Sequence, residues 1–209
     1  MFRLYIISSN NIIENEAKAI NALFDNGMTH FHLRKKTWMK NEVSELIDSI
    51  NTKHHSKIVL HSQFDLIFHY DLAGFHFNSS FPYQEELAIK LRKAEKSVSV
   101  SSHNICDMGE YELESDYQFV SPIFPSISKP DYTEVFDHQK LKNYFVLKPK
   151  SKFIALGGIE PDKIELVKQM NFDGFAVMGF LWQQYEIDSN IYSLIDRFNK
   201  LKSKQLQLL

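Results

Sequence analysis

Side chains that can carry positive charge recur at alternate positions in the stretch "HLRKK", which contains His32, Arg34 and Lys36. If this stretch is a β-strand, the spacing places all three side chains on one face. Three such groups at the end of a strand would suit an anion with several charges, such as a diphosphate. The alternative is a solvated basic edge, which is common for arginine and lysine.

Glycines indicate a second anion site of a different kind. Gly157 and Gly158 are adjacent in "ALGGIEP", and Gly179 comes directly after Met178 at the end of the apolar run "GFAVM". A glycine between a strand and a helix lets backbone N–H groups approach an oxygen-rich ligand. We therefore predict a neutral site built from backbone amides, suited to a monophosphate, beside the cationic one.

Histidine and serine also stand at the ends of apolar runs. His61 ends "KIVLH", and Ser99 and Ser101 alternate with valines in "SVSVS". A histidine there is either functional or a hydrogen-bonded core residue, and a small hydroxylated face either admits a ligand or packs tightly. The sequence has no cluster with metal-ligand spacing and no evident carboxylate pair, which argues against metal-dependent hydrolysis and glycosidase chemistry.

The elements that must position these residues alternate between strands and helices. Helical spacing of apolar residues is clear in 15–27 and 40–53, with Gly27 as an expected helix end. Strands are expected where short runs are rich in β-branched and aromatic residues, at 3–8, 30–35, 57–61, 74–77, 97–101, 117–121, 152–156 and 174–178.

This alternation predicts βαβ units and a parallel sheet, and the number of strands predicts an α/β fold of the (β/α)8 TIM-barrel type. We expect a single domain over residues 1–209, with about 203–209 as a helix end or frayed tail. A doubly wound open sheet is the alternative, although no GxGxxG turn follows the first strand. In a barrel, functional residues gather where the strands end, and the candidate site residues named above lie at the ends of the expected strands.

Composition narrows the class of protein further. The 209 residues are 44% hydrophobic, which is enough for one large core, and a net charge of −2 gives no indication of a nucleic-acid or membrane partner. A single cysteine, Cys106, excludes an intrachain disulfide and fits a cytoplasmic protein. The first apolar run is too short for a membrane span. The sequence does not decide whether the chain forms a homo-oligomer.

Together these positions resemble the thiamine phosphate synthase family and its sister group, the thiazole tautomerases, along nearly the whole chain. The family pattern Gln-x-Arg-x-Lys is similar to "HLRKK", with His32 in place of the glutamine, and Val-Ser-x-His is matched by "VSSH" at Ser101 and His103. Its Pro-Ile-Phe/Tyr-Pro-Thr pattern with a later Thr-Lys is similar to "PIFPSISK", and its Gly-Gly-Ile to "GGI".

The resemblance implies a transferase of thiamine biosynthesis that joins hydroxymethylpyrimidine diphosphate to thiazole phosphate and releases pyrophosphate. In that family the diphosphate leaves first, and the thiazole nitrogen then attacks the pyrimidine carbocation. By resemblance, Arg34 and Lys36 neutralise the diphosphate, Lys129 closes over it, and Ser101 belongs to the catalytic set.

The thiazole phosphate has its own expected ligands by the same resemblance. They are the hydroxyl groups of Ser126 and Ser128 and the backbone at Gly157, Gly158, Met178 and Gly179. The prolines around these serines fit an ordered loop over the barrel mouth rather than a helix.

The resemblance also implies Mg²⁺, which the family holds with two aspartates. Ser62 and Phe81 occupy those positions here, so we expect no metal ligand there, and His32 and His61 are candidates for compensating charge or hydrogen bonds in substrate binding. The tautomerase pattern departs elsewhere, because Pro122 replaces its proton-transferring histidine.

Two alternatives therefore stand beside the synthase. One is a thiazole tautomerase-like aromatase, in which His32, His61 or His103 carries the proton. The other is a non-catalytic barrel that binds thiazole phosphate or thiamine phosphate. All three interpretations involve small phosphorylated molecules.

Overall fold

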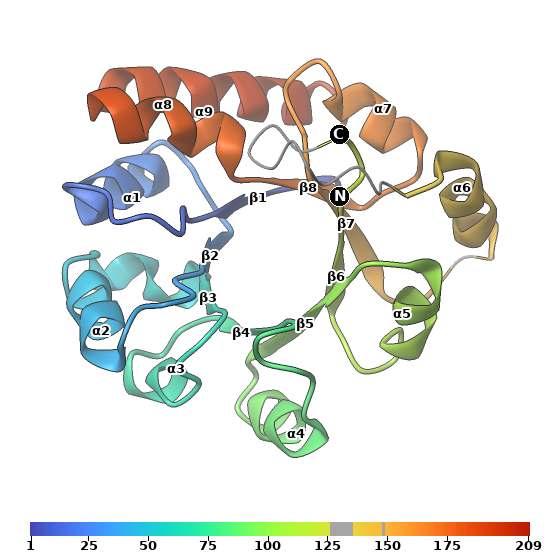
Figure 1. Cartoon of the computed structure of the whole chain (residues 1–209), viewed down its shortest axis with the longest axis horizontal. Helices are drawn as coiled ribbons and strands as arrows, with labels where there is room; N and C mark the ends of the chain where they lie inside the picture. Colours follow the sequence, from blue (N-terminus) through green and yellow to red (C-terminus); the bar gives the residue numbers. More distant parts are fainter. Residues whose placement is uncertain (126–135, 148) are drawn as a thin grey trace.

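The structure, a computed structural model, describes residues 1–125, 136–147 and 149–209. Within these ranges, eight strands form one closed barrel, in which each strand pairs with the next and β8 pairs in parallel with β1. Figure 1 shows the ring of strands with the helices outside it. The predicted (β/α)8 barrel is therefore confirmed, and the open doubly wound sheet was the wrong alternative.

Each predicted strand segment coincides with a strand of the barrel, and only β5 extends beyond its predicted segment, by one residue. The strands are β1 (Arg3–Ile7), β2 (Phe31–Leu33), β3 (Ile58–Leu60), β4 (Gly74–Phe77), β5 (Ser97–Ser102), β6 (Tyr117–Val120), β7 (Lys152–Leu156) and β8 (Gly174–Val177). All neighbours pair in parallel, so the carboxyl ends of all eight strands open on the same face.

The helices pack their apolar faces onto the outside of the barrel. In the first, Ile20, Leu23 and Phe24 are buried, as their spacing predicted. The helices are α1 (Glu16–Asp25), α2 (Lys40–Asp48), α3 (Leu66–His69), α4 (Glu85–Lys93), α5 (Ile105–Glu110), α6 (His138–Val146), α7 (Ile164–Gln169), α8 (Gly179–Asp188) and α9 (Ile191–Leu206), with a 3₁₀ turn η1 (Thr52–Lys57). None of them, in the part of the chain described, is both long and apolar enough to cross a membrane.

Alternation along the strands separates two apolar regions. The larger lies between the strands and the outer helices and includes Leu4 and Ile6 of β1. The smaller lies inside the barrel and contains the alternate residues Tyr5 and Ile7 of the same strand. The barrel interior also holds buried polar side chains, described below, and these set the chemistry at the mouth.

Candidate active site at the barrel mouth

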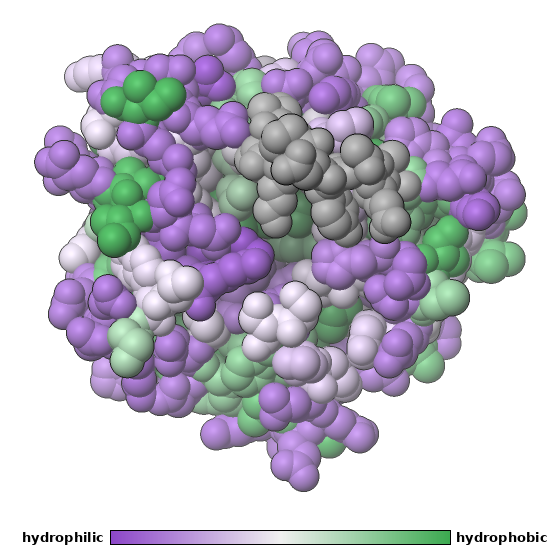
Figure 2. All heavy atoms as spheres, viewed as in Figure 1, coloured by the Kyte–Doolittle hydropathy of each residue, from purple (hydrophilic) through white to green (hydrophobic). Residues whose placement is uncertain are grey.

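A pocket of about 330 Å³ opens where the strands end. Figure 2 shows that the face in view is hollowed near its centre, with hydrophilic residues around much of the hollow. The structure brings most of the predicted site residues to this pocket: Arg34, Lys36, His61, Ser101, Gly157, Gly158, Met178 and Gly179. The cationic and the glycine-rich segments, which are far apart in sequence, therefore line one cavity.

The remaining predicted residues are placed differently. His32 does not line the pocket, because its ring is fully buried beneath it in the barrel interior. Ser126, Ser128 and Lys129 lie outside the described residues, so their predicted roles stay predictions. His103 lines the pocket and is exposed, and its Nδ1 lies 3.0 Å from the carbonyl oxygen of Ser121.

The loop after β1 holds Arg34 in place. The Arg34 N–H donates to Ser8 Oγ at 2.8 Å, and Ser8 Oγ donates to the Arg34 carbonyl oxygen at 3.2 Å. The guanidinium group donates from Nη1 to Asn10 Oδ1 at 3.0 Å. Burial lowers the pKa of Arg34, but an arginine pKa is high enough for the group to stay charged at neutral pH. A fixed cation therefore faces the pocket.

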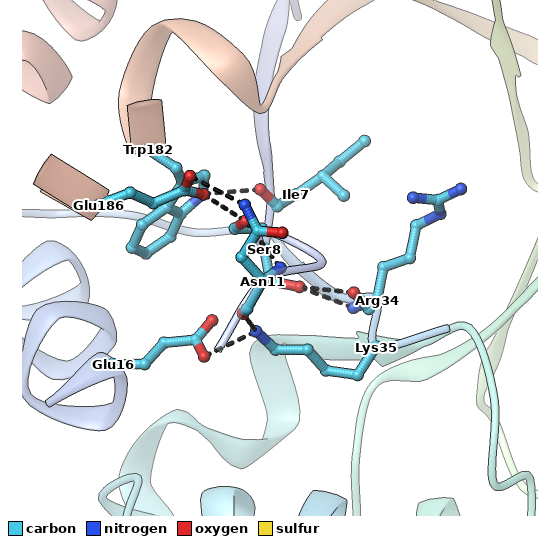
Figure 3. Close-up of polar contacts among 9 residues, drawn as sticks. Ile7, Ser8, Asn11, Glu16, Arg34, Lys35, Trp182 and Glu186 are labelled. Atoms are coloured by element: carbon cyan, nitrogen blue, oxygen red, sulfur yellow. Dashed lines mark hydrogen bonds and ion pairs between the residues drawn. The ribbon is translucent and has the colours of Figure 1, made fainter. Parts of the chain in front are cut away.

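Lys35 points away from Arg34 and supports the same loop from below (Figure 3). Its Nζ lies 2.7 Å from Glu16 Oε2 of α1 and donates to the Asn11 carbonyl oxygen at 2.9 Å. Lys35 is 1% exposed and Glu16 3%, so the ion pair is shielded from water. Burial lowers the pKa of Lys35 and raises that of Glu16, and the attraction between them opposes both shifts.

A second set of contacts secures this loop to α8. Trp182 Nε1 donates to the Ile7 carbonyl oxygen at 2.8 Å, and Asn11 Nδ2 donates to Glu186 Oε2 at 2.9 Å. Ser9 Oγ also donates to the Glu186 carboxylate. Figure 3 shows how these side chains converge on the segment between β1 and α1. The segment between β1 and α1 therefore contacts both α8 and Arg34, and it fixes their positions relative to each other.

The glycine pair after β7 permits a close approach of two loops. Gly157 has φ +97° and Gly158 has φ +61°, which are conformations that favour glycine. A Cβ at Gly158 would lie 2.4 Å from the Pro125 carbonyl oxygen, and one at Gly157 would lie 2.8 Å from Pro122 Cα. The loops after β6 and β7 thus meet at the pocket, and only glycine fits at their contact.

The first turn of α8 supplies the other half of this neutral region. The helix begins at Gly179, directly after β8, and both Met178 and Gly179 line the pocket. The first N–H groups of a helix have no partner within it, and the helix dipole favours negative charge there. The arrangement is that of the recurrent phosphate site of this fold, at the loops after strands 7 and 8.

Three histidines lie together at the base of the pocket, which His61 and His76 line and beneath which His32 is buried. They are His32 of β2, His61 after β3 and His76 of β4, and one ligand-capable atom from each lies within 4.8 Å of the others. Sequence spacing gave no sign of this cluster, because its members come from three different strands. His76 and its partner Tyr117 were not predicted as site residues. The sequence "GFHF" could have indicated His76, because alternation along the strand puts its imidazole on the opposite face from the two phenylalanine rings.

Hydrogen bonds connect the histidines to one another and to hydroxyl groups. His32 Nδ1 lies 2.9 Å from His61 Nε2, and Tyr117 Oη lies 2.8 Å from His32 Nε2. His76 Nδ1 lies 2.9 Å from Ser99 Oγ, and its Nε2 lies 2.8 Å from Ser101 Oγ. Ser101 therefore lines the pocket as a hydroxyl group fixed by His76.

Burial keeps these groups neutral. It lowers the pKa of His76 to about 3 and that of His32 and His61 well below their ordinary 6.5, and charges on neighbouring side chains add to each shift. Burial also raises the pKa of Tyr117. At neutral pH the network therefore contains imidazoles and a phenol rather than ions.

The pocket does not suit the magnesium ion that the resemblance implies. Mg²⁺ prefers oxygen ligands, above all carboxylates, and no aspartate or glutamate is among the described residues that line the pocket. At the family's aspartate positions, Ser62 is partly buried and Phe81 packs against Phe75, with ring centroids 4.8 Å apart. The described residues that line the pocket thus offer no carboxylate ligand for this ion.

The histidine cluster could be considered for a transition metal, because neutral imidazoles bind such ions. Its geometry favours a hydrogen-bonded network instead. The rings of His61 and His76 are stacked, with centroids 4.3 Å apart and planes 27° apart, so their in-plane lone pairs do not converge on one point. Both nitrogens of His32 and both of His76 already have partners.

Comparison with known proteins points to one family. The family model described as thiamine monophosphate synthase matches residues 4–181. A thiamine-phosphate synthase of Clostridium tetani is 23% identical over 205 residues, covering 94% of this chain and 96% of that protein. One of Lysinibacillus sphaericus is 25% identical over 211 residues, covering 95% of both.

A solved structure extends the similarity to three dimensions. The crystal structure of thiamine phosphate pyrophosphorylase from Bacteroides thetaiotaomicron matches with a TM-score of 0.82 and 28% identity, covering 99% of this chain and 98% of that chain. The corresponding protein of Pyrococcus furiosus has a TM-score of 0.78 at 17% identity, which shows a shared fold.

Proposed function

This chain belongs to the thiamine monophosphate synthase family, whose model matches residues 4–181, and we propose that it is a thiamine phosphate synthase. The proposed reaction joins hydroxymethylpyrimidine diphosphate to thiazole phosphate and releases pyrophosphate. One observation carries this proposal. A cationic segment with Arg34 and Lys36 and a glycine-rich, neutral segment at Gly158 and Gly179 line the same pocket. Two phosphorylated substrates need two such regions side by side.

The arrangement suits a reaction in which the diphosphate leaves before the new bond forms. The C–O bond breaks, both electrons go to the departing diphosphate, and the thiazole nitrogen then attacks the pyrimidine carbocation. Such a step needs stabilisation of the leaving group's charge and correct placement of the nucleophile. Arg34, fixed by Asn10, supplies part of that stabilisation. The first turn of α8 would hold the thiazole phosphate.

We further propose that protein cations take over the neutralisation that Mg²⁺ supplies elsewhere in the family. Arg34 and Lys36 line the pocket, and no carboxylate is found among its described lining residues. Arginine can bind phosphate oxygens through two parallel N–H groups, which suits a diphosphate. Lys129, from outside the described residues, is proposed to close over the same group.

Product analysis tests the proposed reaction. Purified protein receives both substrates, with Mg²⁺ or with a chelator, and thiamine phosphate and pyrophosphate are quantified. We expect both products in both conditions. If thiamine phosphate forms neither with Mg²⁺ nor with the chelator, the proposed synthesis is refuted. If the absorbance of the thiazole tautomer falls instead, the tautomerase alternative gains support, and binding without turnover would favour the non-catalytic barrel.

Matched variants assign the charge neutralisation to the pocket. Arg34→Met and Lys36→Met each remove one pocket cation, and we expect pyrophosphate release to slow by about 100-fold or more. Lys18→Met removes an exposed lysine of α1 and is the control, with no change expected. Equal rates in all four proteins would contradict the roles of Arg34 and Lys36.

A further inference from the structure

The interior of this barrel is more polar than the fold requires. Such interiors are usually filled by branched apolar side chains. Here His32, His76 and Ser99 are fully buried, and His61 and Tyr117 are nearly so. A buried polar network is stabilising only when its members are paired, and an apolar core would be simpler to build. The network therefore calls for a functional explanation that phosphate binding does not supply.

Three of these residues form a linear chain of hydrogen bonds. Tyr117 Oη lies 2.8 Å from His32 Nε2, and His32 Nδ1 lies 2.9 Å from His61 Nε2. His32 is thus contacted through both of its ring nitrogens, and His61 through Nε2. An imidazole can accept a proton at one nitrogen while it releases another proton from the second nitrogen, so this is the geometry of a proton relay.

The two ends of the chain meet two different cavities. His61 lines the mouth pocket, and its Nδ1 is buried without a partner among the described residues. Tyr117 lines a second cavity, of about 420 Å³, together with Arg3, Ser97 and Lys152 from the starts of β1, β5 and β7. The chain therefore runs along the barrel axis from the amino-terminal end to the substrate pocket.

We propose that Tyr117, His32 and His61 form a proton relay through the barrel, in which His61 Nδ1 exchanges a proton with the bound substrate. The group that it would contact is an N–H or a basic nitrogen of a heteroaromatic ring. Both substrates of the proposed function contain such a ring. The identity of the substrate therefore rests on the proposed function. The relay adds proton transfer to a pocket in which the described lining residues include no carboxylic acid.

The transfer balances without any further reactant. In the proposed starting arrangement, His61 Nε2–H donates to His32 Nδ1 and His32 Nε2–H donates to Tyr117 Oη. The Tyr117 hydroxyl hydrogen would then be directed to solvent in the second cavity, which Tyr117 lines. A substrate proton moves to His61 Nδ1, and one proton moves along each link. The hydroxyl proton of Tyr117 passes to solvent in that cavity. The substrate has lost one proton, the solvent has gained one, and the reverse transfer restores the first arrangement.

Both end states use the same hydrogen bonds with reversed direction. After transfer, Tyr117 donates to His32 Nε2 and His32 Nδ1–H donates to His61 Nε2, so each group is again neutral. Burial lowers the pKa of His32 and His61 and raises the pKa of Tyr117, in agreement with neutral resting states. His76 holds the ring of His61 by stacking and is itself fixed by Ser99 and Ser101.

Nitrogen-15 NMR of the imidazoles tests the relay without any substrate. We expect both nitrogens of His32 and of His61 to show shifts averaged between protonated and unprotonated imidazole. Tyr117→Phe removes one end of the chain and keeps the ring, so both histidines should settle into one tautomer. Tyr5→Phe is the control, because the Tyr5 hydroxyl is buried nearby without a partner among the described residues. A single tautomer in the wild-type protein, or a stoichiometric transition metal on the histidines, would overturn the relay.

Kinetics with both substrates supply the second readout. Tyr117→Phe should lower kcat about tenfold or more with KM unchanged, and a plot of kcat against deuterium fraction should change from curved to linear. Tyr5→Phe should match the wild type in both. An unchanged plot in Tyr117→Phe would contradict the relay. A wild-type protein that makes no thiamine phosphate would refute the proposed function only, since the NMR measurement still decides on the relay.

Discussion

The substitution Glu16→Gln tests the buried ion pair that supports the pocket. It removes the carboxylate 2.7 Å from Lys35 Nζ and keeps nearly the same side-chain shape. Lys35 would then keep the hydrogen bond to the Asn11 carbonyl oxygen but lose its only negatively charged partner among the ion pairs of the described residues. An ammonium group at a site that is 1% exposed cannot recover its hydration, so the folded protein must become less stable.

The size of the effect follows from the two ways in which the protein can respond. If Lys35 stays charged, removal of one partner from a buried pair typically costs about 3–5 kcal/mol. If Lys35 loses its proton instead, the cost at pH 7 is at most about 5 kcal/mol, because its ordinary pKa is 10.5 and each unit corresponds to about 1.4 kcal/mol. We therefore expect Glu16→Gln to lower the free energy of unfolding by about 3–5 kcal/mol.

Urea unfolding at two pH values provides the assay. If Lys35 loses its proton in the variant, the destabilisation should shrink between pH 7 and pH 9 by up to about 3 kcal/mol, because deprotonation becomes easier as the pH rises. The double variant Glu16→Leu with Lys35→Met should recover most of the loss, because a buried pair can be replaced by apolar side chains at little cost. Wild-type stability in Glu16→Gln would refute this account, whereas a loss that is equal at both pH values would show that Lys35 stays charged.

Three further predictions concern the interior, the loop contact and the cation. Burial lowers the pKa of His76 to about 3, so the unfolded chain binds more protons below pH 6.5. The free energy of unfolding should therefore decrease as the pH falls below 6.5, and at pH 5 this group alone should account for a loss of about 2 kcal/mol relative to neutral pH. Urea unfolding of His76→Gln should show a shallower decline. Gly158→Ala should destabilise the fold by about 1–3 kcal/mol, because its Cβ would lie 2.4 Å from the Pro125 carbonyl oxygen. It should also weaken phosphate binding measured by calorimetry. Gly109→Ala is the control, because a Cβ at Gly109 would have no neighbour within 4 Å. Asn10→Ala should raise KM for the diphosphate substrate several-fold without unfolding the protein, because Arg34 loses its side-chain acceptor.

The strands could be predicted because each leaves a local pattern. β5, for example, alternates serine and valine, and Val98 and Val100 are buried, as that alternation requires. Arg34 and Lys36 could likewise be assigned to the mouth from the end of one strand. Lys35 was not assigned a role, because its burial depends on where α1 places Glu16.

Local sequence patterns could not predict the hydrogen-bonded network inside the barrel. His32, His61 and Tyr117 come from or next to β2, β3 and β6, and a hydrogen bond between them depends on the stagger of strands in the closed barrel. A shift of one residue in any register would turn the side chain toward the outer helices. His32 was therefore predicted as a substrate ligand, whereas the structure places it one layer below the pocket.

Pyrophosphate release in the presence of a metal chelator tests the central claim most directly. The measurement compares wild-type protein, given both substrates, with the double variant Arg34→Met and Lys36→Met. The account predicts pyrophosphate together with an equal amount of thiamine phosphate from the wild type, and a rate lower by about 100-fold or more from the variant. Absence of product from the wild type, or equal rates from both proteins, would contradict it.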